Sequence, residues 1–338
     1  MSIHLMPKDR QLLLLLGGLF TLLMSSVVIT MIIYQMTATN LHTGTVPATC
    51  RQGFATCSYL KRSGLGNIMF QYASMLGISR TRVVKTVLPP DFRLRKYFKM
   101  SAKDHYEIAN TAEWRQYYEI KANAYDDFLV MKLNPCYNMT LVGYFQSFKY
   151  FEQSADEVRQ AFEFHDDIKI QARDFLINAA QSAYGTAATG FELIFIGIHI
   201  RRGDMASHKA VEYGYSSAPK DYFLRAIKRY KNQFYVPMKT KLIFIITSDD
   251  IPWCEDTFED VTATFVYSKG NPDYLDLAIL GQCNHTIITS GSFSWWAGWL
   301  STGNVTYYKG FPVPGSKLES GFSSDRSDYY PKHWRGLE

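Results

Sequence analysis

Two adjacent arginines and an aspartate follow an apolar run that should form a buried strand. Arg201, Arg202 and Asp204 come directly after residues 191–200, FELIFIGIHI. A near-continuous apolar run of this length is typical of a strand that is buried on both faces of a sheet. A guanidinium group offers a planar fork of N–H donors that matches the oxygens of a phosphate. The segment therefore predicts an anion-binding site at the end of a buried strand.

The alternation of side chains along a strand separates the roles of the two arginines. His199 and Arg201 should point to one face, and Arg202 to the other. We expect Arg201 to face the ligand, and Arg202 to orient Asp204 or another wall of the site. A surface salt bridge is the alternative for either arginine, and more so for Arg202.

Two more polar clusters follow predicted strands. Residues 248–250, SDD, follow the apolar run 241–247, and residues 290–294, SGSFS, follow a run that begins at His285. In open parallel sheets, ligands bind at the carboxyl ends of the strands. Any one cluster could be an ordinary loop, but three at successive strand ends predict one shared crevice.

Predicted helices separate these strands and complete the pattern. Residues 219–234 should form a helix with Ser217 as its cap, and a short helix should follow Ile251. Asn271 should cap a further helix that has Pro272 at its first position. The segment SFSWWAGWLS, residues 292–301, should form the last helix. Strands that alternate with helices indicate a parallel sheet covered on both faces, as in a Rossmann-type domain.

A glycine pair near the start of the chain is a second candidate phosphate contact. Gly64 and Gly66 precede a predicted helix over residues 67–80. Glycines allow close approach of the backbone, and a helix N-terminus favours negative charge. A simple turn is the alternative, because the third glycine of a dinucleotide fingerprint is absent. Residues 87–137, farther along, show no clear periodicity and are left unassigned.

The sequence gives no sign of a metal that would bridge a nucleotide diphosphate. No D-x-D triplet occurs in the chain. An enzyme without such a metal must neutralise a leaving pyrophosphate with arginine and backbone donors. The RRGD cluster fits that requirement, so we expect no metal and no cofactor.

The N-terminus carries a membrane-anchor pattern. Residues 12–33 are uncharged and about as long as a bilayer-spanning helix, and Lys8 and Arg10 precede them. A cleavable signal peptide is the alternative, but its apolar region is normally shorter. We expect a cytoplasmic tail at 1–10, a signal-anchor at 11–34 and a stem at 35–55, with the rest across the membrane.

Composition narrows the class of protein further. The chain has 338 residues, 47% hydrophobic content and a net charge of +5. These values indicate a folded chain and exclude a dedicated nucleic-acid binder, which would carry a strongly basic face. Three sequons, at Asn138, Asn284 and Asn304, fit glycosylation in a secretory compartment. The five cysteines predict one or two disulfides and at least one free thiol.

Several motifs together resemble one known family. HIRRGD, residues 199–204, resembles the H-x-R-R-x-D motif of fucosyltransferases that use GDP-fucose. Four further segments resemble the galactoside α-1,2-fucosyltransferases: residues 64–73, 143–151, 246–250 and 290–301. The likeness runs in order from about residue 63 to 334. The residue after RRGD is often aromatic in that family, whereas this chain has Met205, a difference that bears on the acceptor pocket.

The resemblance implies a GT-B-like α/β enzyme with two domains. Residues 56–185 would form the acceptor-side domain, and residues 186–338 the Rossmann-type domain that binds the nucleotide sugar. The enzyme would transfer fucose from GDP-β-L-fucose to the 2-hydroxyl of a terminal galactose on a glycan, with inversion and without a metal. It would lie in the Golgi membrane as a single-pass type II protein. Other regiochemistry, another acceptor or an inactive sugar-binding relative are the alternatives.

The resemblance also assigns roles on the donor side. Arg201 would hold the β-phosphate, and the strand end at His199 would approach the guanine. Asp249 would accept from guanine N–H groups and so select GDP over UDP. Ser292 and Ser294 would donate to the pyrophosphate.

On the other side of the site, Gly66 and Asn67 would close it from the N-terminal domain. Trp295 and Trp296 are expected either in the core or, less readily, as a wall on which a sugar stacks. An inverting transfer needs a group that takes the proton of the attacking hydroxyl. Asp204 is the first candidate, with His208 and Glu212 behind it; the departing phosphate is the alternative.

Overall fold

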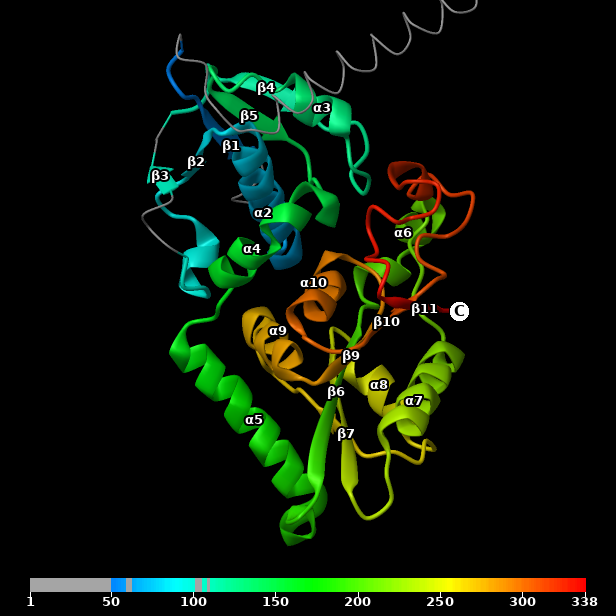
Figure 1. Ribbon diagram of the computed structural model, residues 1–338. Helices are drawn as coiled ribbons and strands as arrows, with labels where there is room; N and C mark the ends of the chain where they lie inside the picture. Colours follow the sequence, from blue (N-terminus) through cyan, green and yellow to red (C-terminus); the bar gives the residue numbers. More distant parts are fainter. Residues whose placement is uncertain (1–49, 59–62, 101–104, 108–109) are drawn as a thin grey trace, which may run out of the picture. The chain divides into compact units, whose positions relative to one another are not determined.

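The computed structural model describes residues 50–58, 63–100, 105–107 and 110–338 (Figure 1). The predicted tail and anchor, residues 1–34, and most of the predicted stem lie outside these residues. Within the part that the structure describes, no helix is both long and apolar enough to cross a membrane. Residues 52–338 form one compact unit.

The first half of this unit contains a five-stranded parallel sheet in the order β3-β2-β1-β5-β4. Its strands are β1 Phe54–Cys57, β2 Lys85–Leu88, β3 His105–Glu107, β4 Arg115–Tyr118 and β5 Met139–Val142. The helices of this half are α2 Leu65–Arg82, α3 Asp127–Lys132, α4 Ala155–Ala161 and α5 Asp166–Tyr184. The predicted helix after the glycine pair is α2. This sheet was not predicted, because strands of three or four residues are too short for a periodic pattern.

The second half contains a six-stranded parallel sheet in the order β11-β10-β9-β6-β7-β8. Its strands are β6 Glu192–Ile200, β7 Thr240–Ser248, β8 Phe265–Tyr267, β9 His285–Ile288, β10 Val305–Tyr308 and β11 Arg335–Leu337. Its helices are α6 His208–Tyr213, α7 Lys220–Phe234, α8 Ile251–Phe258, α9 Asp273–Gln282 and α10 Ser292–Leu300. The predicted α/β class with a parallel sheet is thus confirmed. The two sheets lie on either side of the domain boundary expected near residue 185, and the boundary itself stays a prediction.

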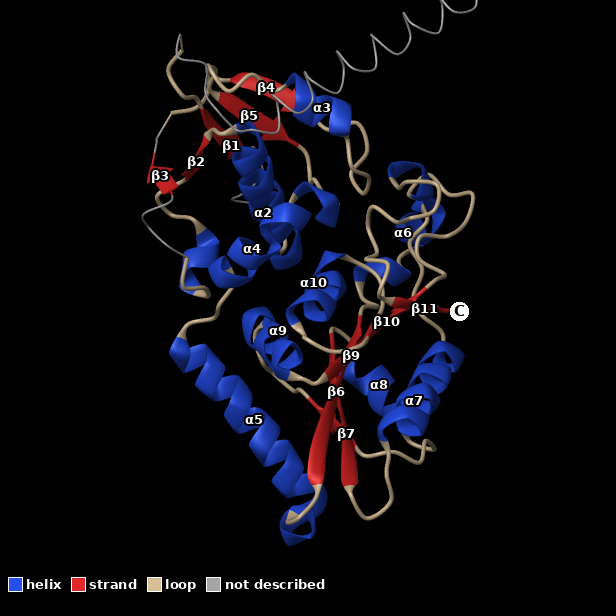
Figure 2. Cartoon of the chain, in the orientation of Figure 1, coloured by secondary structure: helices blue, strands red, loops and turns tan. Residues whose placement is uncertain are grey.

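Helices cover both faces of the second sheet, with α9 on one side and α7 and α8 on the other (Figure 2). Ile196 and Ile198 of β6 belong with Phe223 of α7 to one buried cluster. Ile245 of β7 belongs with Leu277 of α9 to the other buried cluster. Both faces of these strands are therefore in the core, which explains their near-continuous apolar sequence.

The predicted caps of two helices are wrong by one or two residues. Helix α7 has Pro219 at its N-cap, and the buried Ser217 hydroxyl has no hydrogen-bond partner among the described residues. Helix α9 has Pro272 at its N-cap. The side chain of Asn271 donates instead to Ser268 Oγ, at 2.8 Å. Each proline adopts extended backbone angles, so the helix begins only after it.

Helices α2 and α10 pack closely and join the two halves. A Cβ atom on Gly66 would lie 2.5 Å from the backbone nitrogen of Phe293, so the contact requires glycine. Trp296 Nε1 donates to the carbonyl of Gly66 at 3.0 Å. Trp295 and Trp296 are buried, and Phe70 of α2 packs on both rings. The two tryptophans therefore belong to the core and not to a sugar-stacking wall.

The cysteines divide into bonded and free residues. Cys50 and Cys136 are disulfide-bonded, whereas Cys57, Cys254 and Cys283 are free and buried. Burial raises the pKa of all three free thiols. A raised pKa removes the thiolate that would react, so these cysteines are structural.

Candidate functional site

A cavity of about 680 Å³ opens at the carboxyl edge of the second sheet. The chain runs from β6 to β7 on one side and returns to β9 on the other side of β6. Such a switch point between neighbouring strands is where open α/β sheets bind ligands. Residues of the cavity come from the ends of β6, β7 and β9, the starts of α2 and α10, the loop at 144–146 and the end of α6.

Arg201 lines this cavity between two carboxylates. Its Nη1 lies 2.9 Å from Asp249 Oδ2, and its Nη2 lies 2.7 Å from Asp204 Oδ1. Its backbone N–H donates to Thr289 Oγ1 at 3.0 Å, which ties the end of β6 to the end of β9. A Cβ atom on Gly203 would lie 2.5 Å from Asp249 Oδ2, so this pairing depends on glycine. The structure thus holds a guanidinium at the position where the sequence predicted an anion contact.

Arg202 pairs with Asp250, whereas Asp204 pairs with Arg201. Arg202 Nε lies 3.2 Å from Asp250 Oδ2, and its guanidinium lies over the ring of Trp253, 3.8 Å from the centroid. Neither Asp250 nor Trp253 lines the cavity. The contact of Arg202 is therefore a partly exposed salt bridge, the alternative given for it above.

Asp249 is engaged by the protein itself. Its Oδ1 accepts the backbone N–H of Arg202 at 2.9 Å, and its Oδ2 pairs with Arg201. In this structure Asp249 therefore positions Arg201. A guanine at Asp249 would have to share carboxylate oxygens that already accept from the protein, and the expected guanine contact stays a prediction.

A buried hydrogen-bonded group lies behind Arg201. The hydroxyl of Ser294 lies 2.5 Å from His199 Nδ1 and 3.4 Å from Thr289 Oγ1. Burial, and then the nearby charge of Arg201, lower the pKa of His199 to about 3, so the ring is neutral. Ser294 is fully buried and its hydroxyl faces this group. Its expected hydroxyl contact with a pyrophosphate is therefore replaced by a role in fixing the strand end, whereas His199 lines the cavity as expected.

An amide network connects the starts of α2 and α10. Asn67 Oδ1 accepts from the Ser292 hydroxyl and from Gln146 Nε2, the latter at 2.7 Å. Asn123 Nδ2 donates to Gln146 Oε1 at 3.0 Å. Because the Asn67 oxygen is used twice, the group that Asn67 offers to a ligand is its NH₂. Gly66, Asn67 and Ser292 all line the cavity, as predicted.

Asp276 is a cavity residue that the sequence reasoning missed. Its Oδ1 accepts from the Ser268 hydroxyl at 2.5 Å, at the end of β8. Burial raises its pKa to about 6, and the charge of Asp273 adds to the shift. A carboxylate with a perturbed pKa in a cleft is a candidate ligand contact. The available signal was an acid between two leucines, Leu275 and Leu277, in a predicted helix.

The three candidate bases separate by position. Asp204 lines the cavity, with its side chain 68% exposed and paired with Arg201. His208 and Glu212 lie on α6 with side chains 94% and 75% exposed, and neither lines the cavity. Geometry therefore favours Asp204 among the three.

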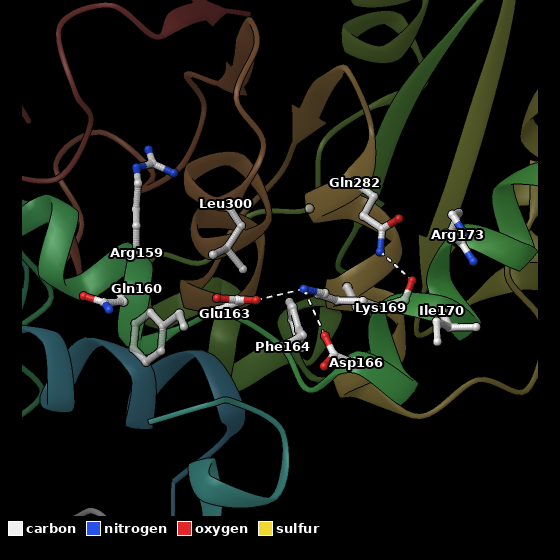
Figure 3. A pocket seen from close by; sticks show the side chains of 13 residues that line it. Arg159, Gln160, Glu163, Phe164, Asp166, Lys169, Ile170, Arg173, Gln282 and Leu300 are labelled. Carbon is white, nitrogen blue, oxygen red and sulfur yellow. Dashed lines mark hydrogen bonds and ion pairs between the residues drawn. The ribbon is translucent and has the colours of Figure 1, made fainter. Parts of the chain in front are cut away.

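A second cavity, of about 870 Å³, lies at the carboxyl ends of α9 and α10, whereas the first cavity lies at their N-termini (Figure 3). Leu300 and Gln282, at the carboxyl ends of these helices, line it. Its Lys169 pairs with Glu163 at 2.8 Å and Asp166 at 3.2 Å, and Gln282 Nε2 donates to the Lys169 carbonyl. None of its lining residues comes from the strand ends at which open α/β sheets bind ligands, so we do not choose it as the candidate site.

Neither the predicted sequons nor a metal site is settled by the geometry. Asn138, Asn284 and Asn304 are exposed, and their glycosylation stays a prediction. Within the described residues, no group of three or more His, Cys, Asp and Glu side chains could hold a metal ion.

The parallel sheets, with an arginine at the switch point of the second sheet, define an α/β protein with a candidate anion site at the carboxyl ends of its strands. Residues 25–338 match the model of Glycosyl transferase family 11, and the chain belongs to that family. This confirms the family expected from the motifs.

Curated relatives and solved structures show similarity over most of the chain. The mouse (Mus musculus) "Galactoside 2-alpha-L-fucosyltransferase Sec1" is 26% identical over 85% of this chain and 74% of its own length. The mouse "Galactoside alpha-(1,2)-fucosyltransferase 2" is 26% identical over 78% and 73%. NodZ α-1,6-fucosyltransferase soaked with GDP-fucose aligns with a TM-score of 0.47 and 10% identity, over 77% of this chain and 95% of that one. POFUT1 in complex with GDP-fucose aligns with a TM-score of 0.46 and 11% identity, over 78% and 99%.

Proposed function

We propose that this protein transfers L-fucose from GDP-β-L-fucose to the 2-hydroxyl of a terminal galactose on a glycan, with inversion and without a metal. The observation that carries the proposal is Arg201, held between Asp204 and Asp249 at the switch point of the second sheet. Membership of family 11 and the names of the two mouse relatives support the choice of fucose and of the 2-hydroxyl. In this proposal the chain is a GT-B-like enzyme, with the donor bound on the second sheet.

The leaving GDP would be stabilised by donors that are already in place. Arg201 supplies N–H groups that the phosphate would share with Asp204 and Asp249. Ser292 and Phe293, in the first turn of α10, line the cavity, and the start of a helix favours an anion. The NH₂ group of Asn67 approaches from the other half. Fixed donors of this kind stabilise charge that develops on a leaving group without reorganisation.

Asp276 would read the guanine in place of Asp249. Guanine presents neighbouring N–H donors on one edge, and an ionised carboxylate accepts two of them. Asp276 lines the cavity, and Ser268 holds one of its oxygens. Uracil offers one N–H on the corresponding edge, so this contact favours GDP over UDP.

The transfer itself needs one proton acceptor. The galactose 2-oxygen forms a bond to the anomeric carbon of fucose while the bond from that carbon to the β-phosphate oxygen breaks. The hydroxyl proton passes to Asp204, or to the departing phosphate, and GDP leaves with the bonding electron pair. The choice of Asp204 is supported by its position in the cavity lining, where it pairs with Arg201.

The deciding experiment uses the full chain, purified in detergent, with GDP-fucose and a panel of galactosides in EDTA. Nuclear magnetic resonance of the product would give the linkage. An α-1,2-linked fucose on galactose is expected. Another linkage would refute the regiochemistry, and a strict requirement for manganese would refute the metal-free mechanism.

The same proposal places the enzyme in the Golgi membrane with its catalytic part in the lumen. Residues 12–33 would form the anchor, and Asn138, Asn284 and Asn304 would be open to glycosylation. Sealed vesicles treated with protease should protect the catalytic part. Cleavage of that part without detergent would refute the topology.

A further inference from the structure

We infer that one end of the cavity is the acceptor subsite, and that it binds a pyranose by packing the apolar face of the sugar against an aromatic wall. The aromatic wall consists of Tyr144, Tyr213 and Tyr215, all of which line the cavity. The inference rests on the proposed transfer of fucose and names where its sugar acceptor binds.

One side of the aromatic wall comes from the end of α6. The rings of Tyr213 and Tyr215 stack at 6.0 Å, and Tyr215 stacks in turn on the buried Phe311 at 5.9 Å. The carbonyl of Tyr213 accepts from the Leu318 N–H at 2.9 Å. Lys317 Nζ lies over the Tyr213 ring, 5.6 Å from its centroid, and the residue is nevertheless 41% exposed. A large ring that is held by its neighbours and still partly exposed at the cavity is suited to a ligand.

The other side comes from a loop in the first half of the unit. The backbone N–H groups of Tyr144 and Phe145 each donate to one oxygen of the Glu119 carboxylate, both at 2.6 Å. Phe145 has a φ of 51°, which is unfavourable for a residue with a side chain. Gln71 and Ser74 bind the carbonyls of Gly143 and Phe145. The loop is therefore held rigidly, and it leaves Tyr144 42% exposed.

The two sides face the same space, and Asp204 lies at its border. Tyr144, Tyr213, Tyr215 and Asp204 all line this one cavity. Asp204 also pairs with Arg201, which belongs to the donor end. A sugar on the aromatic wall would therefore present a hydroxyl to Asp204, next to the bond that breaks.

The chemistry of the wall fits a hexopyranose. The axial hydroxyl of galactose leaves a continuous face of C–H groups on the other side of the ring. Such a face packs on an aromatic ring, while tyrosine hydroxyls bind sugar hydroxyls at the edge.

The test replaces the two exposed rings in the full chain, in detergent. Tyr144→Ala and Tyr213→Ala should each raise the acceptor KM roughly tenfold, a loss typical of truncating an aromatic anchor. The KM for GDP-fucose and the Kd for GDP, measured by calorimetry, should stay unchanged. Tyr144→Phe and Tyr213→Phe should restore most of the acceptor affinity. Tyr235→Ala is the matched control, because Tyr235 is 53% exposed and lies outside the cavity.

Each contrary outcome has a distinct meaning. If GDP binds and the acceptor KM is unchanged in both variants, the aromatic wall is not the acceptor subsite. If the Kd for GDP rises instead, the wall binds the nucleotide and the inference is wrong. Failure of the unaltered chain to bind GDP would overturn the proposed function, and the subsite with it.

Discussion

Replacing Asp276 by Asn should stabilise the folded protein while it weakens donor binding. Burial raises the pKa of Asp276 from 3.8 to about 6. This is roughly two pKa units, and each unit corresponds to about 1.4 kcal/mol. The charged carboxylate therefore lowers the free energy of unfolding at neutral pH by at most about 3 kcal/mol. Since the side chain is partly exposed, about 1–3 kcal/mol is the expected gain on removal of the charge.

The sign of the effect follows from proton binding. A raised pKa means that the folded protein holds this proton more tightly than the unfolded chain. Above about pH 6, Asp276 is ionised in both states and its full destabilising effect is present. The effect shrinks as the pH falls and is absent below pH 3.8. Asp276→Asn should thus raise the free energy of unfolding at pH 8 and leave it nearly unchanged at pH 4.

The effect on the ligand should be opposite. The amide would turn an NH₂ group toward the N–H donors of guanine, and losing two hydrogen bonds to a charged acceptor should weaken GDP binding by about 10²-fold or more. In the unaltered protein, GDP affinity should fall as the pH drops below about 6, because Asp276 then becomes protonated. The variant should lack this dependence.

Two measurements on each protein check this reasoning. Urea unfolding at pH 4, 6 and 8 gives the free energy of unfolding, and calorimetry gives the Kd for GDP. Asp174→Asn, at an exposed position of α5, is the control for a lost charge. If the variant and the unaltered protein have equal free energies of unfolding at pH 8, burial of the Asp276 charge does not destabilise the fold. An unchanged Kd for GDP would show that Asp276 does not read the base.

Three further substitutions test other parts of the site. Arg201→Ala should lower the transfer rate by about 10²–10³-fold, because it removes a donor to the leaving phosphate. Near-normal rates would refute that role. The control Arg173→Ala, at the other cavity, should not change the transfer rate. Gly66→Ala should lower the free energy of unfolding by about 1–3 kcal/mol, since its Cβ would lie 2.5 Å from Phe293 N. The control Gly64→Ala should be neutral, because a Cβ atom there has nothing within 4 Å. Equal urea midpoints for the two variants would contradict the packing argument. Ser294→Ala should lower the free energy of unfolding by about 1–3 kcal/mol, because buried His199 Nδ1 loses its partner. Thermal unfolding identical to that of the exposed-site variant Ser320→Ala would exclude this role of Ser294.

The sequence was informative where strands and helices are long or continuously apolar. The runs before Arg201 and Asp249 predicted β6 and β7, and the run from His285 predicted β9. From these elements the convergence at the carboxyl edge followed. The first sheet escaped prediction because its strands have three or four residues, and tertiary contacts determine their pairing.

Partners of individual side chains were harder to predict than their positions. The sequence placed Asp249 and Ser294 at the site. Their partners, Arg201 and His199, depend on side-chain directions that periodicity does not specify. Asp276 was overlooked because one acid among apolar residues resembles an ordinary position on an amphipathic helix.

The pairing of Arg201 with Asp204 has a consequence for the order in which substrates arrive. A phosphate that binds Arg201 must share the guanidinium with, or displace, the Asp204 carboxylate. In the proposed transfer, an acceptor that arrived before the donor would therefore meet an Asp204 carboxylate that is held by Arg201. An acceptor that arrived after the donor would meet a carboxylate whose partner is shared with, or taken by, the phosphate. Such an arrangement would favour binding of GDP-fucose before the acceptor.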